Sequence, residues 1–267
     1  MESIVAAYGS SSESSNATSA SEAECAAGEN ESTARDDAHV GAKRKRSGGL
    51  HWKRAFPHVD GNWPSHVRID VSVNQELRQL AMHAIKRAQE LVGDDAIAVV
   101  PVDELKLQEG PASDAHSALH VSLSRPFVLT YDQIRDFVDS LRAALKWRQR
   151  FCITLRRSLV LLNDDKTRSF LALRVVEGSG EVVQLLRCVD QCLARFGQPV
   201  YYQDPIPHVS IASSVGEKLA QLTPEQCNSL LACPTATQQM TKSHSLTTSV
   251  AAVHVAVGNK HYDIPLR

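Results

Sequence analysis

The sequence lacks both a long hydrophobic run and a regular cysteine framework. No apolar stretch approaches the roughly 20 residues that a membrane-spanning helix needs. The N-terminus has no basic start followed by an apolar segment, so we expect no signal peptide and no membrane partner. The six cysteines are irregularly spaced, and Cys188 and Cys192 fall about one helical turn apart, which suits buried thiols better than disulfides. These absences predict a soluble protein of a reducing, intracellular compartment.

A strong charge of either sign is also missing. The 267 residues carry a net charge of −1, with 43% hydrophobic and 22% charged residues, which is ordinary for a globular protein. The charge is unevenly distributed, because residues 1–48 carry −3 and the remainder +2. A charge this small neither requires nor rules out a polyanionic partner.

The segment of residues 9–47 lacks aromatic residues and hydrophobic periodicity. Residues 9–47 are rich in Ser, Glu, Ala and Asn, a composition that cannot bury enough apolar surface to offset chain entropy. We therefore predict a disordered tail over residues 1–50 and a folded domain over residues 51–267. The Lys-Arg-Lys-Arg run at residues 43–46 is either a solubilising charge run or a nuclear import signal or nucleic-acid-binding arm.

The folded part mixes helices and strands in two halves. Hydrophobic periodicity and capping residues predict helices at 75–92, 130–147, 181–196 and 223–231. Alternating patterns predict strands at 66–72, 96–101, 118–124, 151–155, 158–162, 169–176 and 207–212, and a hairpin over 248–265 turning at Gly258-Asn259. Each half contains one strand that reads His-Val-Ser. We therefore expect a pseudo-symmetric α+β fold with two sheet-plus-helix lobes around a central cleft.

Two copies of His-Val-Ser are the chemical signal of the sequence. Leu-His-Val-Ser-Leu-Ser spans residues 119–124, and Pro-His-Val-Ser-Ile spans residues 207–211. In a strand, alternate side chains share a face and lie about 7 Å apart. His120 and Ser122 therefore share one face, and so do His208 and Ser210, while the aliphatic residues point to the core. If the two strands are neighbours, two imidazoles and two hydroxyls line one cleft.

Several explanations of this pattern compete. A chance repeat is possible, because Ser is common here. Zinc catalysis is disfavoured by the missing His-x-His and His-x₃-His spacings, and a serine hydrolase by the missing Gly-x-Ser-x-Gly elbow. Two histidines and two hydroxyls do suit a phosphodiester: a neutral imidazole accepts a proton from the attacking oxygen and a protonated one donates to the leaving oxygen. The serines would hydrogen-bond the non-bridging oxygens, and no metal is needed.

The motifs resemble those of the two-histidine phosphoesterase superfamily, and more narrowly of the U6 small nuclear RNA 3′-end-processing phosphodiesterase family. The resemblance covers about residues 54–265. It is carried by Arg-Ala-Phe-Pro-His at 54–58, Gly-Asn-Trp at 61–63, Leu-His-Val-Ser-Leu-Ser at 119–124, Lys-Thr-Arg-Ser-Phe at 166–170, and Tyr-Gln-Asp-Pro at 202–205 leading into Pro-His-Val-Ser-Ile-Ala at 207–212. It implies the bilobal α+β fold of the superfamily.

The resemblance also implies an activity. The family trims uridines from the 3′ end of U6 RNA, in the 3′ to 5′ direction and without a metal or cofactor, so the expected partner is RNA and the expected location is the nucleus. By the resemblance, His208 is the base on the ribose 2′-OH, His120 is the acid to the leaving 5′-oxygen, and Ser122 and Ser210 hold the phosphate. Attack by the 2′-OH leaves a 2′,3′-cyclic phosphate. Whether this is opened to a monophosphate stays undecided, and we expect a monomer.

Four further residues and two competing functions remain to be assigned. Tyr202 is expected to stack on the terminal base, worth about 1–3 kcal/mol, although a buried tyrosine is the alternative. Trp63 is expected to be structural, whereas Lys166 and Arg168 fit phosphate binding and a solvated turn equally well. The competing functions are a cyclic nucleotide phosphodiesterase of the same superfamily and a non-catalytic RNA-binding module.

Overall fold

The computed structural model describes residues 5–7, 59–93, 98–102, 119–232 and 246–267. Most of the predicted tail, including the basic run at residues 43–46, lies outside the described residues. From the N-terminal half the structure describes β1 (Val5–Ala7), β2 (Asn62–Val71), α1 (Gln75–Val92), β3 (Val100–Pro101), β4 (Leu119–Ser122), β5 (Phe127–Thr130) and α3 (Tyr131–Leu145). The C-terminal half contributes β6 (Phe151–Leu162), β7 (Arg168–Glu177), α4 (Ser179–Arg195), β8 (His208–Val215), η1 (Lys218–Gln221), α5 (Pro224–Ser229), β9 (Leu246–Val250), β10 (Ala252–Val257) and β11 (Lys260–Pro265).

Local sequence signals explain where the helices begin and end. The Asn74 side chain accepts a hydrogen bond of 2.8 Å from the Leu77 amide at the start of α1, and Gly93 ends this helix in the left-handed conformation. Helix α3 begins where the Thr130 amide donates to the Gln133 side chain at 3.1 Å. These predicted helices are confirmed, with ends within a few residues of those expected.

The strands form one sheet with two parts that share a single bridge. In one part the order is β4-β2-β10-β11, with β5 also paired to β2. The other part runs β6-β7-β8, with β1 and β9 on β6 and β3 on β8. Among the described residues, the two parts join only where Val121 of β4 pairs with Val209 of β8, antiparallel. The two lobes predicted from sequence are therefore two continuous halves of one sheet.

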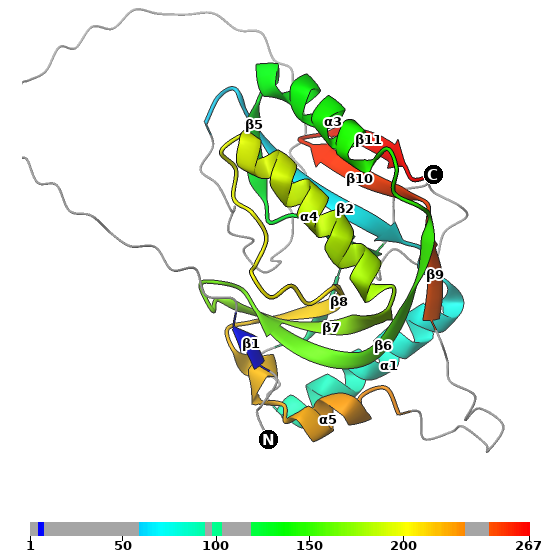
Figure 1. Cartoon of the computed structure of the whole chain (residues 1–267). Helices are drawn as coiled ribbons and strands as arrows, with labels where there is room; N and C mark the ends of the chain where they lie inside the picture. The colour runs from blue at the N-terminus through cyan, green and yellow to red at the C-terminus, as the bar shows by residue number, and fades with distance from the viewer. Residues whose placement is uncertain (1–4, 8–58, 94–97, 103–118, 233–245) are drawn as a thin grey trace, which may run out of the picture. The chain divides into compact units, whose positions relative to one another are not determined.

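The lobes are not simply the two halves of the chain. The C-terminal hairpin of β10 and β11 returns to the first part, where His254 of β10 pairs with Arg68 of β2. Conversely, α1 follows β2 in sequence but packs against β3, β8 and η1 of the other part. Helices α3 and α4 pack against each other, with α3 on β5 and β11 of the first part and α4 on β7 of the second, and α1 lies beside α5 (Figure 1).

The core follows the alternation of the strands. On β2, β4, β8 and β10 one face is mostly buried and aliphatic, through the following residues: Val67, Ile69, Val71, Leu119, Val121, Val209, Ile211, Val253, Val255 and Val257. Burial of each such side chain contributes about 1.5–3 kcal/mol. The intervening residues are mainly polar and half-buried, so the opposite face of these four strands is free to carry chemistry.

The structure corrects three details of the sequence interpretation. The two short strands expected at 151–155 and 158–162 are one strand, β6, interrupted by a bulge at which Arg157 adopts a φ of 63°. Strand β1, which lies within the predicted tail of residues 1–50, was not predicted, and neither were strand β5 and the short helix η1. The C-terminal hairpin was expected from residue 248, whereas β9 is a separate strand that pairs with β6. Such errors arise because bulges and partner strands depend on tertiary contacts.

Trp63 is a packing residue, as expected. It lies half-buried against the core, and a Cβ atom built on Gly258 would approach its Cε3 to 2.7 Å. Gly258 also has a φ of 58°, which side chains other than glycine adopt at a cost. The tryptophan ring thus fills the space that a glycine leaves at the β10–β11 turn.

We predict that Gly258→Ala lowers the free energy of unfolding by about 2 kcal/mol or more, because it combines a positive φ with a clash against the ring. Gly93→Ala is the matched control, since Gly93 has a φ of 65° but open space where the Cβ would lie. It should lose only about 1 kcal/mol. Urea denaturation measures both, and equal losses would show that the Trp63 contact has no energetic weight.

Candidate active site

The four motif residues lie on one face of the sheet at the junction of its two parts. His120 and Ser122 of β4 and His208 and Ser210 of β8 are all half-buried, while the valines between them are fully buried. Because Val121 pairs with Val209 and the strands are antiparallel, the next residues on either side face each other crosswise. His120 lies opposite Ser210, and Ser122 lies opposite His208. Each imidazole therefore has the other motif's hydroxyl as its neighbour.

Sheet geometry gives the size of this cluster. Directly opposite residues have Cβ atoms about 5 Å apart, and diagonal ones about 7–8 Å. His120 and His208 are diagonal, so their rings are close enough to reach opposite sides of one phosphate group between them. The proximity has an electrostatic consequence, because charge on His120 lowers the pKa of His208. The structure thus brings together all four residues of the two motifs.

His208 is held in one tautomer. Its Nδ1 lies 2.7 Å from the Ile206 carbonyl oxygen, and a carbonyl can only accept, so Nδ1 carries the hydrogen and donates it. The lone pair of the neutral ring is then on Nε2. The pKa of His208 is lowered, mainly by burial and further by His120, although the bond to Ile206 opposes the shift. A neutral ring with a free Nε2 lone pair is the form that a general base requires.

A third histidine, His66 of β2, belongs to the site and was missed by the sequence analysis. Its Nε2 lies 3.2 Å from the Ser122 hydroxyl oxygen, and its ring meets His120 edge-on with centroids 5.4 Å apart. Burial lowers the pKa of His66 to about 3, with smaller contributions from His120 and Arg68. His66 is therefore neutral at physiological pH. A proton on His120 would further disfavour a second proton on the neighbouring His66 ring.

A neutral His66 has one N–H, and its position decides what Ser122 can do. If Nε2 carries the hydrogen, His66 donates to the Ser122 oxygen, and the serine hydroxyl is then free to donate to a third group. The sequence contains one hint that His66 lies on the polar face, because it lies an even number of positions from Arg68 and Asp70 along β2. The pairing of β2 with β4 that places it beside Ser122 cannot be read from the pattern.

Charged residues extend the polar face beyond the histidines. Arg68 donates from Nε to the Asp70 carboxylate at 2.7 Å, and His254 approaches the same carboxylate at 3.8 Å. In the pairing of β2 with β4, Arg68 lies opposite Ser122 and Asp70 lies opposite His120. The two motif histidines thus have different surroundings, with a carbonyl at His208 and a carboxylate across from His120.

Tyr202 lies in a second cluster built by three segments. Its hydroxyl donates to Asp164 at 3.0 Å, and the guanidinium of Arg125 lies 5.0 Å from its ring centroid. Arg125 also forms an ion pair with Asp164, and the Tyr201 ring meets Tyr202 edge-on at 5.2 Å. The ring is half-buried rather than enclosed. Its stacking on a base stays a prediction.

Lys166 and Arg168, the two remaining candidates for phosphate binding, lie at the β6–β7 turn and at the start of β7. Lys166 is exposed in the β6–β7 turn with a φ of 52°, and Arg168 at the start of β7 donates to the Ser213 hydroxyl at 3.5 Å. Within the described part of the chain, no three His, Cys, Asp or Glu side chains gather closely enough to hold a metal ion. Of the predicted buried thiols, Cys188 and Cys192 are both buried and unbridged, which confirms that interpretation.

None of the helices in the described residues is both long enough and apolar enough to cross a bilayer.

Comparison with known proteins connects this site to a named group. The family model HVSL, described as an uncharacterised conserved protein, matches residues 20–265. The chain is similar to U6 snRNA phosphodiesterase 1 of Mus musculus, with 32% identity over 80% of this chain and 73% of that protein. It is also similar to U6 snRNA phosphodiesterase 1 of Homo sapiens, with 28% identity over 80% of this chain and 73% of that protein.

Among solved structures, Kluyveromyces marxianus Usb1 matches with a TM-score of 0.53 and 18% identity, over 76% of this chain and 98% of that chain. The same protein solved with uridine monophosphate matches equally well. A likeness at such low identity shows a shared fold. The predicted two-lobed α+β fold is therefore confirmed.

The lowered pKa of His66 predicts how stability depends on pH. Between pH 6.5 and about 3 the unfolded chain binds a proton on His66 that the folded chain rejects. Stability is therefore lost as the pH falls through this window, by up to about 1.4 kcal/mol per pH unit for one such group. Urea unfolding of His66→Asn from pH 7 to pH 4 should show a shallower slope than the unmodified protein.

His261→Asn serves as the control, because His261 is exposed on β11. It should leave the slope unchanged. If His66→Asn also leaves the slope unchanged, His66 titrates normally and is not held neutral by its surroundings.

Proposed function

Because the chain belongs to the U6 snRNA phosphodiesterase 1 family, we propose that it is a metal-independent 3′–5′ exoribonuclease that trims the uridine-rich 3′ end of U6 small nuclear RNA. The observation that carries the proposal is the crossed pairing of two imidazoles and two hydroxyls at the β4–β8 bridge. The name of the mouse relative states both the RNA and the phosphodiesterase activity, and the uridine monophosphate bound to the Kluyveromyces protein agrees with a uridine nucleotide as ligand.

His208 is proposed as the general base. Its neutral Nε2, opposite the Nδ1–H that bonds the Ile206 carbonyl, would remove the proton from the ribose 2′-OH of the penultimate nucleotide. The 2′-oxygen then attacks the phosphorus, forming the 2′,3′-cyclic phosphate as the bond to the 5′-oxygen breaks. The requirement for a 2′-OH limits the reaction to RNA.

His120 is proposed as the general acid. It lies opposite Asp70 in the pairing of β2 with β4, and it would donate its proton to the departing 5′-oxygen of the terminal nucleotide. The proton taken by His208 and the proton given by His120 balance, so the released nucleoside leaves with a neutral hydroxyl. A water molecule activated by His120 would open the cyclic phosphate in the reverse sense.

Ser122 and Ser210 are proposed to hold the non-bridging oxygens, where negative charge increases in the transition state. The bond between His66 and Ser122 supports this role, because donation from His66 leaves the serine proton available for the phosphate. Tyr202, half-buried beside Arg125, is proposed to stack on the terminal uracil.

Further parts of the proposal concern the whole chain. We propose a nuclear location, which an activity on U6 RNA supports. The basic run at residues 43–46 is proposed as the import signal, within an N-terminal tail of residues 1–50 that is disordered outside β1. The folded domain is proposed to act as a monomer, since all four motif residues come from one chain.

We predict that His120→Ala and His208→Ala each lower kcat by about 10²–10⁴-fold, because each removes one proton transfer. The assay is shortening of a 5′-labelled RNA that ends in several uridines, with excess EDTA and resolution of single nucleotides. His261→Ala, on the exposed side of β11, is the control and should retain full activity. Activity that survives in either motif variant, or that EDTA abolishes, would contradict the proposed chemistry.

The lowered pKa of His208 predicts the shape of the pH profile. The base must be neutral, so activity falls when His208 is protonated, and a lowered pKa moves this acid limb of kcat/KM below the ordinary value of 6.5. An acid limb above pH 6.5 would contradict the assignment of His208 as base. A 2′-deoxy sugar on the penultimate nucleotide should prevent cleavage at every pH.

A further inference from the structure

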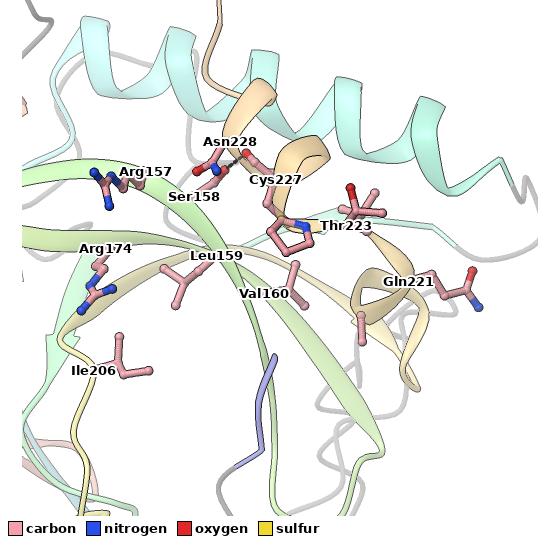
Figure 2. A pocket seen from close by; sticks show the side chains of 13 residues that line it. Arg157, Ser158, Leu159, Val160, Arg174, Ile206, Gln221, Thr223, Cys227 and Asn228 are labelled. Atoms are coloured by element: carbon pink, nitrogen blue, oxygen red, sulfur yellow. Dashed lines mark hydrogen bonds between the residues drawn. The ribbon is translucent and has the colours of Figure 1, made fainter. Parts of the chain in front are cut away.

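A pocket of about 570 Å³ lies beside the candidate active site, at the bulged middle of β6. Figure 2 shows it between β6 and the segment formed by η1 and α5, with Arg157 and Arg174 at one end and Gln221 and Thr223 at the other. Its lining combines apolar and polar side chains: Leu159, Val160, Ile206, Ala220, Leu222 and Pro224 with Ser158, Gln221, Thr223 and Asn228. We call it the β6 pocket.

The β6 pocket adjoins His208 through two of its lining residues. Ile206 lines the pocket, and its carbonyl accepts the hydrogen bond from His208 Nδ1 at 2.7 Å. Arg174 of β7 also lines it and lies directly opposite His208 in the pairing of β7 with β8. Opposite residues share a face of the sheet, so the polar face that carries the motif histidines continues toward the pocket.

The order of residues across the sheet gives the direction of a bound RNA. His120 lies on β4, His208 on β8, Arg174 on β7 and Arg156 on β6, in that spatial order. The general acid serves the leaving terminal nucleotide, and the general base serves the ribose upstream of the scissile phosphate. The upstream strand therefore continues from His208 away from His120, across β7 toward β6 and its pocket.

The charge at this end of the pocket fits a phosphate backbone. Arg157 and Arg174 are both exposed, and among the ion pairs of the described residues neither is matched with a carboxylate. The β6 bulge brings Arg156 and Arg157 to the surface in succession, with Arg157 in the left-handed conformation at a φ of 63°. A residue held in this conformation carries a local cost that its surroundings must offset.

The interior of the pocket fits a nucleobase. Leu159 and Ile206 belong to a small apolar cluster with Ala172, which lies opposite Ser210. The side chains of Gln221 and Asn228 lie at its other side, available for hydrogen bonds to base edges. The Thr223 hydroxyl accepts from the Gln226 amide as the cap of α5 and keeps its own hydrogen to donate. An apolar floor with a few polar groups and a cationic rim is the arrangement that single-stranded RNA binds.

We propose that the β6 pocket binds RNA upstream of the scissile phosphate, with a base over Leu159 and Ile206 and with the preceding phosphate at Arg157. This inference rests on the proposed function, because it takes the acid and base assignments from it. It adds a subsite that makes the enzyme distinguish a long RNA tail from a dinucleotide.

The test compares UpU with a six-nucleotide oligouridylate. UpU has no phosphate upstream of the scissile one, so Arg157 has nothing to bind. We expect the unmodified protein to show a several-fold higher kcat/KM on the hexamer. Arg157→Asn should remove most of this advantage and leave UpU unaffected, because asparagine tolerates the left-handed conformation and the bulge is kept. It should also reduce the salt dependence of the hexamer by about 0.7 in log–log slope.

Two matched controls make the result specific. Arg187→Asn removes the same charge from an exposed position on α4 and should change neither substrate. Asn228→Trp fills the pocket from the exposed side of α5, whereas Ser229→Trp puts the same bulk on the neighbouring residue, which does not line it. Only Asn228→Trp should remove the hexamer advantage.

The outcomes separate this inference from the function on which it rests. If UpU and hexamer are cleaved equally well by the unmodified protein, or if the hexamer advantage survives in both Arg157→Asn and Asn228→Trp, the subsite is overturned and the proposed function stands. If neither substrate is cleaved, the proposed function fails and the inference fails with it.

Discussion

One backbone pairing, between Val121 and Val209, holds the candidate active site together. It is the sole bridge between the two parts of the sheet within the described residues, and it lies between the four motif side chains. Both valines are fully buried, so the core fixes which face each neighbouring residue takes. A shift of one residue in either strand would send an imidazole into the core and a valine to the surface. Hydrophobic register therefore sets the catalytic geometry.

The polar face controls protonation through its surroundings. Burial keeps His66 and His208 neutral, and each feels the charge on His120 between them. His208 is turned toward the Ile206 carbonyl, whereas His120 lies across from a carboxylate that Arg68 already binds. Two chemically identical side chains thus have different surroundings, as the proposed acid and base roles require. The same polar face continues over β7 to the arginines of the β6 pocket, which is where we propose that the upstream RNA binds.

Much of the fold could be predicted from the sequence, because its signals are local. Asn74 and Gly93 mark the ends of α1, and alternation marks β2, β4 and β8. The motif histidines and serines could be found because they repeat. The partners of these strands could not be predicted, since pairing is a tertiary property. His66 was therefore missed, although it lies on a predicted strand, and the bulge at Arg157 was taken for a break between two strands. His66 belongs to the site through strand pairing, and the sequence pattern does not predict which strands pair.

The most direct test of the paired imidazoles requires no substrate. Nitrogen-15 NMR of labelled histidines reports the tautomer and the pKa of His208, in the unmodified protein and in His120→Gln. We expect His208 to carry its hydrogen on Nδ1, to titrate below pH 6.5, and to rise in pKa when His120 is removed, because the neighbouring charge is lost. A pKa of His208 that does not respond to the loss of His120 would show that the two rings are not neighbours.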